Sequence, residues 1–148
     1  MRQALFLIIF VILLNACNIT VPSNKLDLPI AIQNEIKNKI AKGKILLYYH
    51  SGDCSFCYGT IQAISKKFPD IPLVSISSSK DVTLVNYYLE QIDFKGISLS
   101  DSTLQFLKNN YKLLNEQKIF LIDLQYKILA GGSEFNQNTI EKVSRAIR

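Results

Sequence analysis

The chain has 148 residues, of which 48% are hydrophobic and 20% charged, and its 17 Lys and Arg against 12 Asp and Glu give a formal net charge of +5. This length suits one domain with its own hydrophobic core and leaves too little chain for two. The basic residues are scattered, with no arginine-rich patch and no basic stripe interleaved with aromatic residues, which argues against a nucleic-acid partner. A scattered positive excess instead fits a solvated surface that favours anionic lipid headgroups.

The first residues have the pattern of an export signal. Arg2 gives a basic start, and Ala4–Leu14 is an uninterrupted apolar run. The run is too short for a mature transmembrane helix, which needs about 20 residues, but it suits the apolar region of a secretory signal. Residues 14–17, Leu-Asn-Ala-Cys, resemble the lipobox of bacterial lipoproteins, which implies a signal peptide over residues 1–16 and a lipid on Cys17. An uncleaved anchor or an ordinary signal peptide is the alternative.

The cysteine count agrees with lipidation. An odd total of three would leave one thiol unpaired in an exported chain, whereas a lipid on Cys17 leaves Cys54 and Cys57 as a pair. Residues 17–28 show no periodicity and are predicted to be a tether between membrane and domain. Asn18 lacks the acidic character of an inner-membrane retention signal. We therefore expect a lipid-anchored protein of the bacterial cell envelope that faces the periplasm, with the outer membrane preferred.

The apolar spacing of the first half predicts alternating helices and strands. In chain order these are a helix between Asp27 and Gly43, a buried strand over Ile45–Tyr49, a helix from the cysteine pair to about Phe68 and a strand over Leu73–Ile76. A strand, a helix and a second strand in this order imply a right-handed crossover between two parallel neighbours.

The second half predicts a helical insertion and then a hairpin. The expected elements are a helix over Lys80–Ile92, a loop over Asp93–Leu99, a shorter helix capped by Ser100, strands over Ile119–Asp123 and Lys127–Ala130, a turn at Gly131-Gly132 and a terminal helix. The predicted domain, residues 29–148, is therefore of the α/β class. It has a mixed sheet of about four to five strands flanked by helices, with the helical insertion before the C-terminal hairpin and helix.

Cys54 and Cys57 lie where an apolar strand gives way to a helix. A helix start offers unpaired N–H groups and a partial positive charge, both of which favour a thiolate. Cys54 is placed to be exposed and activated, while Cys57 continues the buried stripe of Ile61, Ile64 and Phe68. This division suits thiol–disulfide exchange through a mixed disulfide. The alternative, a purely structural disulfide, is a poor staple because the ring it closes is very short.

These features together resemble the thioredoxin-like family, in particular its membrane-anchored periplasmic thiol–disulfide oxidoreductases. The resemblance is carried by a strand that ends in CxxC at a helix start, a helical middle, and a hairpin built from Phe120–Asp123 and Lys127–Leu129. It implies a thioredoxin fold in which Cys54 attacks and Cys57 resolves, with no cofactor and no metal. The implied partners are exported proteins that carry disulfides and a redox donor protein. It leaves open whether the chain reduces or oxidises its substrates.

Gln117 is a departure from this family. The spacing from Tyr111-Lys112-Leu113 to Phe120 places Gln117 where the family has a cis-proline that packs against the CxxC and receives the substrate strand. A non-proline cis bond costs about 2.5–4 kcal/mol. We therefore expect a trans peptide at Gln117 and an altered substrate groove.

His50 and Asp53 stand where the family usually has aromatic and tryptophan residues before the first cysteine, and Tyr48 aligns with its buried acid. The Asp53 carboxylate would oppose a thiolate at Cys54, whereas a protonated His50 would favour one. Both residues are candidates for tuning the cysteine pair, and His50, the only histidine, is also a candidate for proton transfer.

A second hypothesis is a binding module of the same fold whose CxxC does not turn over, or a lipoprotein that handles Cu(I). Cys54, Cys57 and His50 offer ligands that suit this ion, because soft thiolates select Cu(I). Zinc is disfavoured because two thiolates and one imidazole fall short of the four ligands of a structural zinc site.

Overall fold

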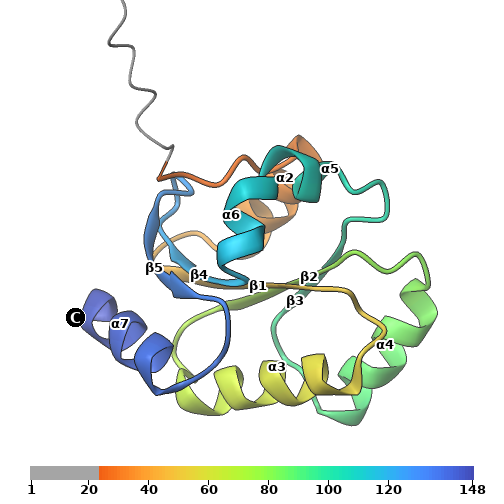
Figure 1. The fold of residues 1–148 in the computed structure, drawn as a ribbon. Coiled ribbons are helices and arrows are strands. Elements are labelled where there is room, and N and C mark those ends of the chain that lie inside the picture. Colours follow the sequence, from red (N-terminus) through yellow and green to blue (C-terminus); the bar gives the residue numbers. More distant parts are fainter. Residues whose placement is uncertain (1–23) are drawn as a thin grey trace, which may run out of the picture.

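A five-stranded sheet lies between two layers of helices (Figure 1). The structure is a computed structural model that describes residues 24–148. The predicted signal peptide, the lipid site at Cys17 and most of the predicted tether lie outside the described residues. Within residues 24–148 no helix combines the length and the apolar character needed to cross a membrane.

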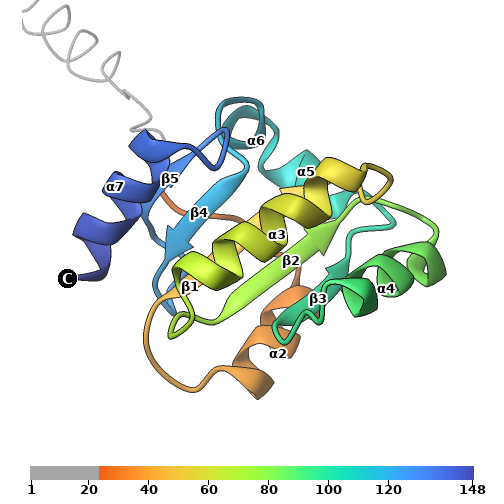
Figure 2. The same cartoon turned by 90° about the horizontal axis from the view of Figure 1, so that it is seen from below.

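The helices and strands alternate as expected through the first half of the chain. The helices are α2 (Ile30–Lys39), α3 (Ser55–Lys67), α4 (Val82–Gln91), α5 (Gln105–Asn109), α6 (Tyr111–Glu116) and α7 (Gln137–Ile147). The strands are β1 (Ile45–His50), β2 (Leu73–Ser77), β3 (Ile97–Ser100), β4 (Ile119–Ile122) and β5 (Ile128–Gly132). Helices α2, α5 and α6 cover one face of the sheet, and α3 and α4 cover the other (Figures 1 and 2).

The strand order β3-β2-β1-β4-β5 places β1 at the centre of the sheet. Strands β1, β2 and β3 are parallel, whereas β4 runs antiparallel to both β1 and β5. All six residues of β1 are buried, because a central strand is covered on both faces. The predicted fold class, a mixed α/β sheet with a helical insertion before the hairpin and last helix, is confirmed.

Two predictions about the middle of the chain are wrong. The segment predicted as a loop over Asp93–Leu99 ends in strand β3, whose buried Ile97 pairs with Val74. The single helix expected after Ser100 is instead two short helices, the first of which has Leu104 as its N-cap residue and takes its side-chain acceptor from the buried Asp101. The Asp101 carboxylate accepts hydrogen bonds from the amides of Phe106 and Leu107 at 2.9 and 3.0 Å.

Gly131 and Gly132 lie in β5 and not in a turn, which corrects a third expectation. A Cβ on Gly132 would overlap the side chain of Thr139 in α7, and one on Gly131 would overlap the backbone of Ile119. The two glycines therefore allow close approach between elements. The hairpin turn is made by Asp123, whose carboxylate accepts the amides of Gln125 and Lys127.

Residues 24–28 are part of the folded domain. Leu26 and Leu28 are 1% and 2% exposed. The Leu26 amide donates to the Tyr126 carbonyl at 2.9 Å, and the Ile128 amide donates to the Asn24 carbonyl at 2.8 Å. The folded domain therefore begins by Asn24, several residues ahead of the boundary expected at residue 29.

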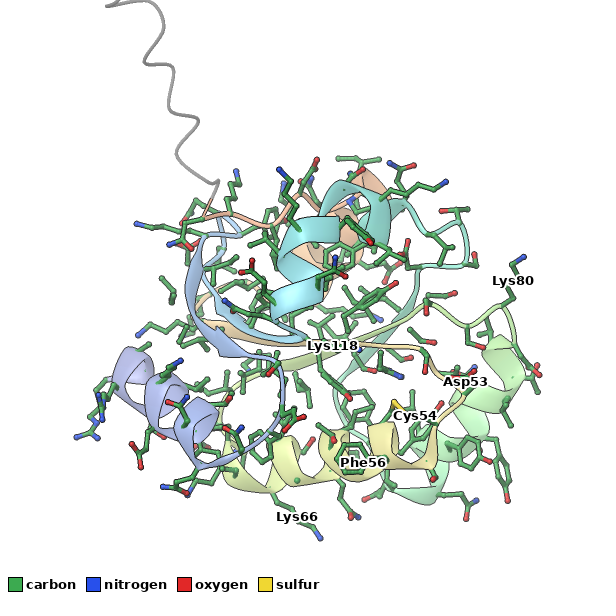
Figure 3. The ribbon with its side chains drawn as sticks, viewed as in Figure 1. Asp53, Cys54, Phe56, Lys66, Lys80 and Lys118 are labelled. Carbon is green, nitrogen blue, oxygen red and sulfur yellow. A yellow bond between two sulfur atoms is a disulfide. The ribbon has the colours of Figure 1, made fainter. Side chains whose placement is uncertain are left out.

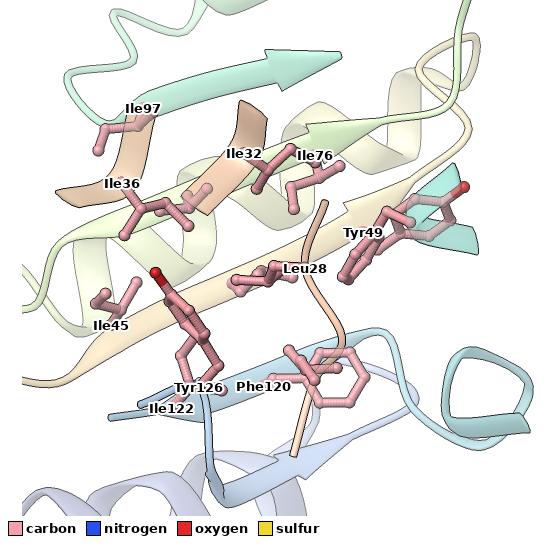
Figure 4. Close-up of a cluster of buried hydrophobic side chains, with 14 of the residues drawn as sticks. Leu28, Ile32, Ile36, Ile45, Tyr49, Ile76, Ile97, Phe120, Ile122 and Tyr126 are labelled. Carbon is pink, nitrogen blue, oxygen red and sulfur yellow. The ribbon is translucent and has the colours of Figure 1, made fainter. Parts of the chain in front are cut away.

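The sheet divides the hydrophobic core into two clusters. The cluster on the α2 side is shown in Figure 4, and its labelled members are Leu28, Ile32, Ile36, Ile45, Tyr49, Ile76, Ile97, Phe120, Ile122 and Tyr126. The cluster on the α3 side contains Cys57 together with Tyr48, Tyr58, Ile61 and Ile64. The second cysteine of the CxxC is thus a core residue.

Candidate functional site

The CxxC lies at the carboxyl end of the central strand. β1 ends at His50, residues 51–54 form a short loop, and α3 begins at Ser55. Figure 3 shows Cys54 and Asp53 at one end of the molecule, above the start of α3. The amino terminus of α3 therefore points its unpaired N–H groups at the cysteine pair.

Cys54 and Cys57 form a disulfide, with their Cα atoms 5.4 Å apart. Cys54 is the N-cap residue of α3, and its Sγ accepts a hydrogen bond from the Cys57 amide at 3.2 Å. Cys54 is partly exposed, whereas Cys57 is only 6% exposed. The exposed sulfur is thus the one that the helix start would stabilise as a thiolate.

The loop before the cysteines is held by its backbone geometry and by one tyrosine. Gly52 has φ +86°, and a Cβ there would overlap the side chains of Ser77 and Ser79. The Tyr58 hydroxyl, from the first turn of α3, donates to the Gly52 carbonyl at 2.6 Å. The close approach of Gly52 to Ser77 and Ser79 and the hydrogen bond from Tyr58 therefore fix the position of Cys54 relative to α3.

His50 is a buried and neutral side chain. It is 2% exposed, and its Nε2 lies 2.8 Å from the Ser75 hydroxyl. Its ring stacks on Tyr48 with centroids 5.3 Å apart and meets the edge of Tyr58 at 5.8 Å. Burial lowers the pKa of His50 to about 4, although the Asp53 carboxylate opposes this shift. The imidazole is therefore uncharged at neutral pH, and its Nδ1 has no hydrogen-bond partner among the described residues.

Asp53 supplies a fixed negative charge beside Cys54. Its side chain is exposed, and a hydrogen bond from the Ser51 side chain is the main cause that lowers the pKa of its carboxyl group. With His50 neutral, the carboxylate and the α3 amino terminus are the two opposing electrostatic influences on the exposed sulfur.

Tyr48 is buried on the α3 side of the sheet, at the position that aligns with a buried acid in the thioredoxin-like family. Burial raises the pKa of its phenol, against an opposing hydrogen bond with Thr60, so Tyr48 is neutral at ordinary pH.

Tyr58 and Ser75 were not predicted as site residues. A serine inside the apolar run of β2 was the available signal for Ser75, because a buried hydroxyl needs a partner.

Gln117 lies at the same end of the sheet as the cysteines. The amide of Tyr49, near the end of β1, donates to the carbonyl of Lys118 at 2.9 Å. Gln117 ends α6 with φ −141°, and its amide donates to the Leu113 carbonyl at 2.8 Å. The described residues contain no cis peptide bond, so the bond before Gln117 is trans, as expected. Its buried Oε1 faces Gly131 and has no donor within the described part of the chain.

The structure does not group His50 with the cysteines as a set of metal ligands. Across residues 24–148, no three His, Cys, Asp or Glu side chains converge on a point where an ion could be held. The Nε2 of His50 is instead directed at Ser75.

Comparison with solved structures identifies the architecture. No protein-family model and no curated protein sequence matches the chain. The thioredoxin domain of a thiol-disulfide oxidoreductase from Bacteroides vulgatus superposes with a TM-score of 0.61 at 15% identity, covering 75% of this chain and 84% of that one. The chain has a thioredoxin-like fold. StoA from Bacillus subtilis matches with a TM-score of 0.53 at 16% identity, covering 72% and 84% of the two chains. A secreted disulfide oxidoreductase from Mycobacterium tuberculosis matches with a TM-score of 0.50 at 12% identity, covering 70% and 79%.

Within this thioredoxin-like fold, Cys54 and Cys57 occupy the strand-to-helix junction at the centre of the sheet. The arrangement can form and break a disulfide between an exposed and a buried sulfur.

Proposed function

We propose that the chain is a thiol–disulfide oxidoreductase that acts on exported proteins. The observation that carries this proposal is the disulfide between Cys54, the partly exposed N-cap of α3, and the buried Cys57. An exposed sulfur at a helix start is the attacking group that exchange chemistry needs. A second sulfur within bonding distance is the group that completes the exchange.

The reaction proceeds in two displacements. In the reduced form the Cys54 thiolate attacks one sulfur of a substrate disulfide, forming a mixed disulfide and releasing the other substrate sulfur as a thiolate that takes up a proton. The Cys57 thiol then loses its proton and attacks the Cys54 sulfur, which forms the Cys54–Cys57 disulfide and releases the second substrate sulfur. Two electrons pass from the dithiol to the substrate, and a redox donor protein returns them. The same steps in reverse oxidise a substrate dithiol.

Two groups next to Cys54 adjust its ionisation in our proposal, and two further side chains shape its surroundings. The carboxylate of Asp53 opposes the thiolate of Cys54, and the amino terminus of α3 favours it, so these two groups set the balance between thiol and thiolate. The neutral ring of His50 packs beneath the loop and supplies no charge at neutral pH. We propose that Gln117, at the same end of the sheet as the cysteines, borders the substrate strand, and its amide already donates to the Leu113 carbonyl at the end of α6.

We place the protein in the bacterial cell envelope, attached through a lipid on Cys17, facing the periplasm and preferably at the outer membrane. The signal pattern over residues 1–16 supports this placement. A secreted disulfide oxidoreductase among the proteins of similar fold also supports it.

The test is insulin reduction by the purified full chain together with a trapping experiment. In Cys57→Ser the mixed disulfide on Cys54 cannot be resolved, so this variant should accumulate substrate adducts that dithiothreitol releases. Cys54→Ser is the matched control, since it has the same loss of the disulfide but no attacking sulfur. Equal adduct levels in the two variants would refute the assignment of Cys54. Tight Cu(I) binding in a parallel titration, without insulin reduction, would favour the binding-module alternative.

A further inference from the structure

The two ends of the sheet differ in what they carry. Strands β1, β2 and β3 begin at one end, where β4 also finishes, as the pairing of Ile45 with Ile122 shows. We name this the tether end, because the segment from Asn24 enters the fold there, beside Tyr126 and Ile128 of the hairpin. The CxxC lies at the opposite end, after the last residue of β1 (Figure 3).

The length of chain before Asn24 limits how far the tether end can stand from a membrane. An extended chain from Cys17 to Asn24 spans about 25 Å at roughly 3.5 Å per residue. The 13 residues of α3 separate Cys54 from this end of the fold by about 20 Å, at 1.5 Å per residue. A chain attached at Cys17 thus keeps its tether end within about 25 Å of the membrane, and the charges at the two ends decide which of them faces the bilayer.

Exposed cations gather at the tether end. Helix α2 finishes there with Lys37 and Lys39 in its last turn, and α3 finishes there with Lys66 and Lys67. Helix α7 also ends there, with Arg145 in its last turn, because Lys44 from the start of β1 donates to the final carbonyls of α7. Figure 3 shows Lys66 and Lys80 well apart, with Lys80 near Asp53 at the CxxC end.

The carboxylates at the tether end are fewer and partly engaged. Asp93 pairs with Lys95, and Asp123 accepts the amides of its own turn. Asp27, Asp70 and Glu90 are further exposed carboxylates near this end, and Glu35 and Glu141 pair with Lys39 and Arg145 at 3.4 and 3.5 Å.

The CxxC end is less basic. Its loops and helix ends carry the carboxylates of Asp53, Asp81 and Glu116 beside Lys80 and Lys118. The positive charge that looks scattered along the sequence is thus collected by the fold at the end where the chain enters.

Helix stabilisation accounts for only part of this pattern. Cations in a last helical turn interact favourably with the helix dipole, which explains Lys66, Lys67 and Arg145. Lys42 and Lys127 are also exposed at the tether end, but both lie outside helices.

An apolar groove opens among these cations. It has a volume of about 640 Å³, Phe68, Ile71 and Phe94 line it, and its rim carries Lys66 and Lys95 together with Asp70 and Asp93. The apolar lining suits acyl chains, and the exposed lysines outside the groove suit the phosphates of a phospholipid. A nucleic acid would use the cations but not the apolar lining.

We propose that the tether end is a docking surface for anionic phospholipid headgroups of the membrane to which the chain is attached. The inference rests on the membrane attachment included in the proposed function, but not on the cysteine chemistry. Each lysine close to an anionic bilayer strengthens association by a factor of about five. The attraction acts over a Debye length of about 8 Å at physiological salt. Docking in this orientation turns Cys54 away from the bilayer and toward exported proteins.

The test measures lysine acylation by mass spectrometry on the full chain reconstituted in vesicles. One preparation contains only phosphatidylcholine, and the other adds phosphatidylglycerol. In the anionic vesicles Lys66, Lys67 and Lys127 should react several-fold more slowly, and high salt should restore their rates. Lys80 and Lys118, which are exposed at the CxxC end, should react equally in both preparations. Equal rates at all five lysines would overturn the proposal, and so would equal protection of Lys80 and Lys118.

Paired variants separate lipid docking from other causes. K66Q/K67Q should lose most of the protection at Lys127 in anionic vesicles, whereas the charge-matched control K80Q/K118Q should keep it. Protection of Lys66 by heparin in the absence of vesicles, at the level seen with anionic vesicles, would assign the surface to a soluble polyanion and refute lipid docking. Insulin reduction measured on the same samples is independent, so failure of docking and failure of the proposed enzyme can be told apart.

Discussion

Replacing His50 with phenylalanine should remove a loss of stability that the wild-type protein shows at acidic pH. Burial lowers the pKa of His50 from 6.5 to about 4 in the folded protein. The unfolded chain therefore binds a proton as the pH falls through 6.5, while the folded protein binds it only near pH 4. Across this window the unfolded state holds more protons, so the free energy of unfolding falls as the pH falls.

The size of the effect follows from the same two values. Each pKa unit corresponds to about 1.4 kcal/mol, so the shift from 6.5 to about 4 gives a loss of about 3 kcal/mol, complete below pH 4 and absent above pH 6.5. The phenylalanine keeps an aromatic ring against Tyr48 and Tyr58 but has no proton to bind. It also loses the hydrogen bond to Ser75, which lowers stability at neutral pH by about 1 kcal/mol.

The assay is urea denaturation of the oxidised protein, wild type and H50F, at pH values from neutral to about 4. Contributions from Asp and Glu residues are common to both proteins, so the difference between the two curves isolates His50. Ser75→Ala is the matched control, because it removes the same hydrogen bond and keeps the imidazole, and it should retain the wild-type pH dependence. Parallel curves for wild type and H50F down to pH 4 would show that the folded imidazole titrates normally and would refute the reasoning.

Three further substitutions, each measured by urea denaturation of the oxidised protein, test the packing of the loop before Cys54, of the entering segment around Asp27 and of the backbone at Gln117. Gly52→Ala should lower the free energy of unfolding by at least about 2 kcal/mol, since φ is +86° and a Cβ would overlap Ser77 and Ser79, and a neutral result would refute the packing beneath the loop. Asn110→Leu should lower the free energy of unfolding by about 2–4 kcal/mol and speed amide exchange at Leu26, because the Asn110 side chain bonds to both the amide and the carbonyl of Asp27. The control is Asn109→Leu, at an exposed neighbouring position. Gln117→Pro should lower the free energy of unfolding by about 3 kcal/mol, because the φ of −141° at Gln117 is outside the range of proline and the hydrogen bond from its amide to the Leu113 carbonyl is lost. A variant that is more stable and more active would contradict this.

The elements best predicted from sequence were those with long apolar patterns. The uninterrupted run of β1 and the three- and four-residue spacing of α3 gave both their type and their place in the fold. Strand β3 was not predicted because it has only four residues, of which two are serines, so it has no clear apolar pattern. It is ordered by pairing with β2. Residues 24–28 looked like a tether because their order depends on partners far along the chain, such as Asn110 and Tyr126.

The candidate site was predicted unevenly for a similar reason. The position of the cysteine pair at a helix start follows from local sequence, and so does the exposure difference between Cys54 and Cys57. The neutrality of His50 does not, because it depends on how completely β2 and α3 bury the ring. The roles of Tyr58 and Ser75 required the three-dimensional contacts themselves.

The two edges of the sheet affect whether copies of the chain would associate through their strands when crowded on one surface. At one margin, the segment around Asn24 and Leu26 covers the start of the hairpin, with Lys25 opposite Lys127. At the other, β3 stops after four residues. Short or covered margins offer few unpaired backbone groups for another strand to join. With the membrane attachment proposed above, molecules confined to two dimensions would collide often, and this architecture would let them separate again without merging their sheets.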